Sequence, residues 1–214
     1  MSSKKHIEIL VIGSGPGGYA AAFRAADLGR NVIIVDKDPT LGGVCLNRGC
    51  IPSKTLLHIA KVLDEANSLK KMGVSFTKPK IDIEAVRDWK SKVVTQLSGG
   101  IAQMAKARNV ETIQARASFI SDNEVELDSK TGKQILTFDH CIIAAGSSSS
   151  AVPGIPMDNE NVLTSKTALD LKKIPKKLLV IGGCYIGLEM GTVYSALGSN
   201  VSLAEFLPNL LPGA

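Results

Sequence analysis

The feature that most constrains the fold is a glycine-rich turn between a strand, a helix and a second strand. The apolar run IEILVI at residues 7–12 leads directly into a G-x-G-x-x-G at residues 13–18. A segment with helical spacing then ends at Gly29, and the run NVIIVD closes on Asp36, 23 residues after Gly13. A buried parallel strand that enters such a turn and helix is typical of dinucleotide-binding units.

Each part of this unit has a physical role. Gly13 permits a tight turn, Gly15 lets the backbone approach a pyrophosphate, and Gly18 lets the helix pack closely on the strand. The amides at the helix N-terminus attract phosphates, and Asp36 can accept hydrogen bonds from a ribose diol. Since all the parts are in register, the sequence predicts a dinucleotide site rather than a plain glycine turn.

The same pattern returns near the other end of the chain. Residues 178–205 contain a strand, a glycine turn, a helical segment and a strand that ends at Glu205, again 23 residues after Gly182. Gly187 is kept, but Cys184 replaces the second motif glycine. A side chain at that point should hinder the approach of a pyrophosphate, so we expect an atypical second site.

The segments between the two units predict further elements. Residues 53–71 have helical character, and residues 82–108 predict a long helix interrupted by Gly99–Gly100. Several short strands are expected between residues 111 and 138, followed by the buried strand FDHCII and a small-residue turn at Ala144–Ser147. The next segment, SSSSAVPGIP, has the composition of a linker.

Two of the four cysteines, Cys45 and Cys50, lie five residues apart. They could form half of a zinc site, a structural disulfide or a redox-active pair. In a regular helix their Cα atoms would be about 8.7 Å apart, whereas a disulfide needs less than about 7 Å. The pair can therefore close only where the helix is interrupted, and Asn47 and Gly49 both tolerate unusual backbone angles.

Zinc is disfavoured because a structural site needs about four ligands, and neither the other two cysteines nor the three histidines have ligand spacing. We expect no metal site. A structural disulfide is disfavoured in a cytosolic chain, where thiols are kept reduced. The remaining interpretation is a catalytic or redox-switching dithiol.

Composition excludes other classes of function. The net charge of +5 is dispersed and aromatic residues are only 4%, which argues against nucleic-acid binding. The apolar run at the N-terminus is too short for a signal peptide, and no stretch approaches the roughly 20 apolar residues of a membrane span. We expect a cytoplasmic protein without a membrane partner.

The two dinucleotide starts, the run GGVCLNRGCIPSK and the turn AAG together resemble the flavoprotein disulfide reductases, the class I pyridine nucleotide-disulfide oxidoreductases. The segment CLNRGCIPSK most resembles the corresponding motif of the dihydrolipoamide dehydrogenase branch of this family. The resemblance implies an α/β fold: a Rossmann-like FAD-binding domain at residues 1–150, with a parallel sheet in three-layer ββα packing. Residues 151–214 would begin a Rossmann-like NAD-binding domain. A C-terminal dimerisation domain, with a His-Glu catalytic base, is expected to be absent, so we expect the 214 residues alone to be inactive.

The resemblance also implies a role for individual residues. Cys45 would exchange with a dithiol substrate, Cys50 would face the flavin, and Lys54 would lie near the flavin ring. FAD would be bound by Gly13, Gly15, Pro16, Gly17, Gly18, Asp36, Lys37, Gly42, Gly43, Val44, Cys45, Lys54, Ala117, Ala145, Gly146 and Ser147. NAD would be bound by Gly182, Gly183, Cys184, Tyr185, Ile186, Gly187 and Glu205.

The implied activity is that of a dihydrolipoyl dehydrogenase contributing to cell redox homeostasis. Electrons would pass from protein-bound dihydrolipoamide through a Cys45–Cys50 disulfide and FAD to NAD⁺. The partners would be lipoyl domains of 2-oxo acid dehydrogenase or glycine-cleavage complexes, and the full-length enzyme would be a homodimer. The alternatives are a disulfide reductase of the glutathione or mercuric type and a non-catalytic flavin-binding fragment.

Overall fold

The computed structural model describes residues 4–211, which form two compact units. One unit combines residues 4–47 with residues 94–148, and the other combines residues 48–93 with residues 149–211. A domain division at residue 150 follows chain order, whereas each compact unit is discontinuous in sequence. The division therefore stays a prediction, and the two units are described separately.

The first unit is built on one six-stranded sheet. Its strands are β1 (Lys5–Ile12), β2 (Val32–Asp36), β3 (Glu111–Gln114), β4 (Arg116–Phe119), β5 (Glu124–Ser129) and β6 (Gly132–Ile143). Their order is β3-β2-β1-β6-β5-β4. Neighbours from β3 to β6 are parallel, and β6, β5 and β4 pair antiparallel. Strand β6 is long enough to pair with both β1 and β5.

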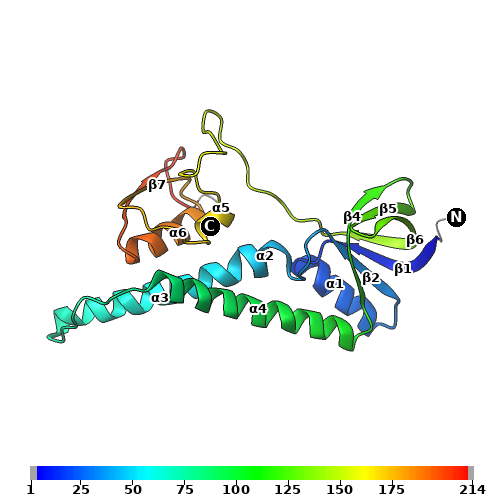
Figure 1. Cartoon of the computed structure of the whole chain (residues 1–214), viewed down its shortest axis with the longest axis horizontal. Coiled ribbons are helices and arrows are strands. Elements are labelled where there is room, and N and C mark those ends of the chain that lie inside the picture. Colours follow the sequence, from blue (N-terminus) through cyan, green and yellow to red (C-terminus); the bar gives the residue numbers. More distant parts are fainter. Residues whose placement is uncertain (1–3, 212–214) are drawn as a thin grey trace. The chain divides into compact units, whose positions relative to one another are not determined.

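Alternate residues of the parallel strands supply two cores, because successive side chains in a strand point to opposite faces. Leu10 and Ile33 pack in one cluster with Val125 and Leu127 of β5. Strand β4 also contacts β2, so the antiparallel strands fold back over this face (Figure 1). This arrangement supplies the outer β layer of the predicted ββα packing.

Helices cover the other face of the sheet. Helix α1 (Pro16–Asp27) and the later part of α4 (Ile83–Ala107) contribute Phe23 and Ala105 to a cluster with Val11 and Ile34. The predicted three-layer α/β architecture is therefore confirmed. The predicted interruption of α4 is wrong, since the helix continues through Gly99–Gly100. Burial of Ser98 and Ala105 on either side of the glycines offsets their poor helix propensity.

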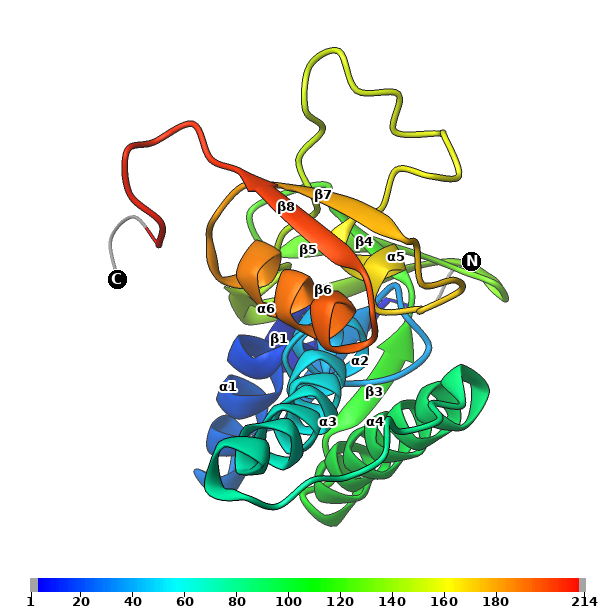
Figure 2. The same cartoon turned by 90° about the vertical axis from the view of Figure 1, so that its left-hand side faces the viewer.

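The second unit contains a smaller parallel sheet and several helices. Its elements are α3 (Cys50–Ser68), the 3₁₀ helix η1 (Leu69–Met72), the start of α4, α5 (Ser165–Ala168), β7 (Lys177–Ile181), α6 (Tyr185–Ala196) and β8 (Asn200–Ala204). Strands β7 and β8 pair in parallel over α6 (Figure 2). Tyr194 of α6 is buried in the core and donates a hydrogen bond from its hydroxyl to Ala168 O at 2.9 Å.

The face of β7–β8 opposite α6 is less well covered. Leu178 packs against the core of the unit, whereas Leu179 and Ile181 of the same strand are more than half exposed. Among residues 4–211, no helix is both long and apolar enough to cross a membrane.

Candidate functional site

The first glycine turn lies between β1 and α1, where the chain itself requires two of its glycines. Gly13 has a φ of +102°, which favours glycine, and a Cβ there would overlap the carbonyl oxygen of Ala144. A Cβ at Gly18 would overlap the carbonyl oxygen of Gly13. Gly15 differs, since the nearest atom to an added Cβ is Gly43 Cα at 3.9 Å. The space in front of Gly15 is therefore open.

Two distant segments meet this turn. Gly42 donates its amide to Ser14 O at 2.9 Å, and a Cβ on Gly43 would come within 2.6 Å of Gly15 Cα. The backbone of Ala144 reaches the turn from β6 and donates to Ile12 O at 2.8 Å. The predicted residues Gly13, Gly15, Pro16, Gly17, Gly18, Gly42, Gly43, Ala145, Gly146 and Ser147 thus belong to three segments that converge on one turn.

Helix α1 begins at Pro16, directly after the turn. Gly15 is its N-cap, and no side chain caps the first amides. No acidic residue occupies the first turn of the helix. Since helix N-termini carry unpaired amides and a partial positive charge, the arrangement suits a phosphate group.

Asp36 ends β2 beside the turn, and its carboxylate is held by three donors. Oδ2 accepts the amide and the hydroxyl of Ser14 at 2.7 and 2.6 Å, and Oδ1 accepts the amide of Asp38 at 2.9 Å. Ser14 is fully buried. Ser14 is not among the residues predicted from the sequence, although it lies between the first two glycines of the predicted motif.

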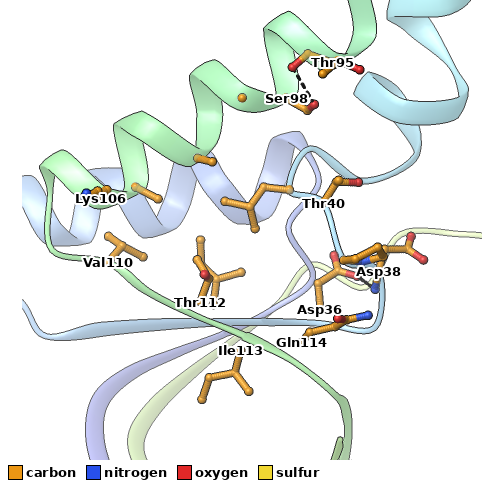
Figure 3. Close-up of a pocket in the computed structure, with 16 residues that line it drawn as sticks. Asp36, Asp38, Thr40, Thr95, Ser98, Lys106, Val110, Thr112, Ile113 and Gln114 are labelled. Carbon is orange, nitrogen blue, oxygen red and sulfur yellow. Dashed lines mark hydrogen bonds between the residues drawn. The ribbon is translucent and has the colours of Figure 1, made fainter. Parts of the chain in front are cut away.

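A cavity of about 620 Å³ opens beside Asp36 (Figure 3). Helix α4 forms one wall with Thr95 and Ser98, and the ends of β2 and β3 line another part. Asp36, Asp38 and Gln114 gather at one end of the cavity, and Lys106 lies at the other (Figure 3). Open α/β sheets bind ligands at the carboxyl ends of their strands, so we include this cavity in the candidate site.

The remaining predicted FAD contacts of the first unit occupy varied positions. Lys37 and Val44 are exposed, and the carbonyl of Lys37 accepts a hydrogen bond from the Gln114 side chain at 3.3 Å. Ala117 of β4 is partly buried against the core of the sheet. The adjoining Ala115 donates its amide to Asp36 O at 2.9 Å, which fixes the strand containing Ala117 beside the acid.

The helical segment that contains the two cysteines is interrupted between them. Cys45 is half-buried in α2 (Gly43–Arg48), and Cys50 is exposed as the first residue of α3. The break falls at Gly49, whose φ of −147° and ψ of −109° are not helical. Asn47, which sequence analysis treated as a second irregular position, is helical and donates its side-chain amide to Gly43 O at 3.0 Å. The disulfide itself stays a prediction.

Lys54 projects from α3 toward α6 within the second unit. Its Nζ lies 2.6 Å from Glu189 Oε1. Lys54 is among the residues predicted from the sequence, whereas Glu189 is not, because the acid belongs to a helix 135 residues further along the chain. Its position one turn into the helix of the second glycine motif was the only available signal.

The second glycine turn repeats the hydrogen bonds of the first. Glu205 accepts the amide of Gly183 at 2.6 Å and the amide of Leu207 at 2.8 Å. These amides favour the ionised carboxylate and hold the pKa of Glu205 below its ordinary value. A Cβ at Gly187 would overlap the carbonyl oxygen of Gly182, whose φ is +99°. The other predicted contacts, Cys184, Tyr185 and Ile186, are exposed.

Comparison with known proteins gives concordant results. Residues 7–214 match the family model described as pyridine nucleotide-disulphide oxidoreductase. Dihydrolipoyl dehydrogenases from Vibrio cholerae and Haemophilus influenzae are 49% and 48% identical over the whole chain. The chain covers 45% of each of these relatives.

A solved structure has a similar fold. It is a Cu(II) complex of an HOCl-induced flavoprotein disulfide reductase from Escherichia coli, 27% identical in sequence, with a TM-score of 0.79. The match covers 98% of this chain and 44% of that protein.

Proposed function

The chain belongs to the pyridine nucleotide-disulphide oxidoreductase family, and from this premise we propose that it acts as a dihydrolipoyl dehydrogenase with FAD and NAD⁺ as its cofactors. The substrate class follows the names of the relatives that are 48–49% identical. The resemblance of the run CLNRGCIPSK to this branch of the family supports the same substrate class, and the spacing of Cys45 and Cys50 supports a redox-active dithiol.

One observation carries the proposal. Gly43 lies against Gly15 of the dinucleotide turn, and Cys45 follows Gly43 by two residues at the start of α2. A thiol is thereby tied, through two peptide units, to the turn that would receive a dinucleotide pyrophosphate. Electrons can pass between the cysteine pair and a bound dinucleotide cofactor only if the two lie close together.

The residues of the first unit fit FAD. The open space before Gly15 is a cradle that a Cβ would fill, the first amides of α1 can bind phosphate, and Asp36 is oriented by Ser14. FAD held there would supply two-electron transfer between the dithiol and NAD⁺. The family resemblance implies that Lys54 lies near the flavin ring; within the second unit its ammonium group pairs with Glu189.

The cysteines carry the exchange with the substrate. One thiolate of a dihydrolipoyl group attacks Cys45 Sγ, breaks the Cys45–Cys50 bond and releases Cys50 as a thiolate. The second substrate thiol, after losing its proton, attacks the mixed disulfide and releases Cys45. The substrate leaves as a cyclic disulfide, and the protein keeps two electrons as a reduced dithiol.

The partners in this function are lipoyl domains of 2-oxo acid dehydrogenase or glycine-cleavage complexes, in the cytoplasm, with the enzyme acting as a homodimer. The dihydrolipoyl group named for the relatives supports the first of these assignments.

The test is a visible spectrum of the purified chain supplied with FAD, followed by anaerobic titration with dihydrolipoamide. We expect a flavin band near about 450 nm and consumption of one dithiol per chain. Cys45→Ser and Cys50→Ser should abolish that consumption, and the matched variant Cys141→Ser should keep it. The absence of a flavin band, or preferential reaction with glutathione, would contradict the proposal.

A further inference from the structure

The two strand–turn–helix–strand segments, residues 7–36 and 178–205, form the same set of hydrogen bonds. Equivalent positions in the two segments can therefore be compared directly. In each segment, the acidic residue at the end of the second strand, Asp36 or Glu205, accepts hydrogen bonds from two backbone amides. One amide belongs to the residue after the first motif glycine, 22 residues earlier, and the other to the residue two positions after the acid. In each segment, the backbone carbonyl of the residue after the first motif glycine accepts a hydrogen bond from a backbone amide in the loop that follows the acid. The bonds are Ser14–Asp36, Asp38–Asp36 and Gly42–Ser14 in the first unit, and Gly183–Glu205, Leu207–Glu205 and Leu211–Gly183 in the second.

Cys184 therefore occupies the position of Gly15. Each is the N-cap of a 12-residue helix, and neither makes a side-chain capping bond. Their backbones agree closely, with φ and ψ of −67° and −178° at Gly15 and of −88° and −178° at Cys184. The extended conformation is open to any residue, so the cysteine leaves the turn undistorted.

The fold does not explain why position 15 is glycine. A Cβ at Gly15 would meet only Gly43 Cα, at an ordinary contact distance of 3.9 Å. At Gly18 and Gly187, in contrast, a Cβ would overlap the backbone of the turn. The remaining reason for glycine at the second motif position is the close approach of a pyrophosphate to the backbone.

From this comparison we infer that Cys184 is the residue that sets, and lowers, the dinucleotide affinity of the second site. Its exposed side chain stands where the pyrophosphate of NAD(H) must approach the turn. Glu205 and the amides of the second turn form the same hydrogen bonds as Asp36 and the amides of the first turn, so the backbone of the turn is preserved. The inference rests on the proposed function, which assigns NAD to this unit.

The decisive measurement is NADH binding by the purified chain, saturated with FAD so that the first site is filled. Cys184→Gly should tighten the NADH dissociation constant by about tenfold or more, because it removes the steric conflict. Cys184→Ala is the matched control, since it keeps the Cβ and removes only the sulfur, and it should remain closer to the unchanged chain. Equal dissociation constants for the unchanged chain and Cys184→Gly, including no measurable binding by either, would overturn the inference.

The reciprocal variant tests the same steric argument at the other copy. Gly15→Cys should lower FAD occupancy by about tenfold or more while thermal unfolding stays cooperative, because an added Cβ would meet only Gly43 Cα, at 3.9 Å. FAD occupancy equal to that of the unchanged chain would overturn the argument. Failure of the unchanged chain to take up FAD would instead contradict the proposed function. The NADH dissociation constants of the unchanged chain and Cys184→Gly would then be compared in the Gly15→Cys background, where the first site is obstructed, and equal values there would still overturn the inference about Cys184.

Discussion

Gly17 and Gly18 are neighbours in the sequence, but the fold requires only one of them to be glycine. A Cβ at Gly18 would overlap the Gly13 carbonyl oxygen, whereas a Cβ at Gly17 would touch the Ala144 methyl group at 3.9 Å. We expect Gly18→Ala to lower the free energy of unfolding by about 3 kcal/mol or more, because the turn must shift to relieve the overlap. Gly17→Ala, the matched control, should change it by less than about 1 kcal/mol. Chemical denaturation of both variants is the measurement, and equal losses would contradict the assignment.

Glu205 makes a pH-dependent contribution whose sign follows from its hydrogen bonds. The amides of Leu207 and Gly183 hold its pKa in the folded chain below the ordinary value of 4.5. The stabilisation is therefore fully present above pH 4.5 and is lost as the pH falls through the lower, folded-state pKa. The melting temperature of the unchanged chain should fall more steeply than that of Glu205→Gln below pH 4.5. Parallel curves for the two proteins would show that the carboxylate is not held in this way.

At the scale of elements, the break between α2 and α3 is the feature with the clearest chemical consequence. Because Gly49 leaves the helical conformation between Cys45 and Cys50, we expect mild oxidation to join these two cysteines and to leave Cys141 and Cys184 as thiols. Alkylation followed by mass-spectrometric mapping measures the pairing. A Cys141–Cys184 bridge, or four alkylated thiols after oxidation, would contradict the prediction.

Local patterns predicted most elements of the first nucleotide unit correctly. Strand β1, the glycine turn, α1 and β2 follow from apolar runs and glycine spacing, which act over neighbouring residues. The continuity of helix α4 does not follow from local patterns, because burial of Ala105 against the sheet outweighs the low helix propensity of Gly99 and Gly100. Local helix propensity predicts a helix poorly where tertiary packing contributes more to its stability.

The candidate site shows the same limit. The glycines and Asp36 are visible in the sequence because their spacing is fixed by one continuous unit. The Lys54–Glu189 pair joins helices that are distant in sequence, and the contact of Gly43 with Gly15 depends on a loop folding back. Such contacts follow from the fold and leave no periodic signal in the chain.

At the scale of the whole molecule, the chain passes three times between its two compact units, and α4 contributes residues to both. In the second unit, one face of the small parallel sheet exposes apolar side chains. Leu179 and Ile181 of β7 have exposed fractions of 61% and 54%, whereas the alternating Leu178 packs toward the core.

This surface should limit the solubility of the purified chain. We expect Leu179→Thr combined with Ile181→Thr to reduce concentration-dependent association, because threonine suits a strand and removes apolar surface from water. Leu178→Thr is the control on the opposite face, and it should lower stability without reducing association. Sedimentation velocity over a range of concentrations is the measurement, and unchanged association of the double variant would refute the prediction.

The repeated hydrogen bonds of the two nucleotide units carry an evolutionary consequence. Tandem duplication of one ancestral unit would leave two copies under two kinds of selection, one for folding and one for binding. Positions 18 and 187 remain glycine because the backbone of either copy excludes a side chain. Positions 15 and 184 differ, and at position 15 the backbone leaves space for a Cβ. If selection for nucleotide binding relaxes in one copy, we expect substitutions at position 15 or 184 to accumulate before substitutions at glycines that the fold requires.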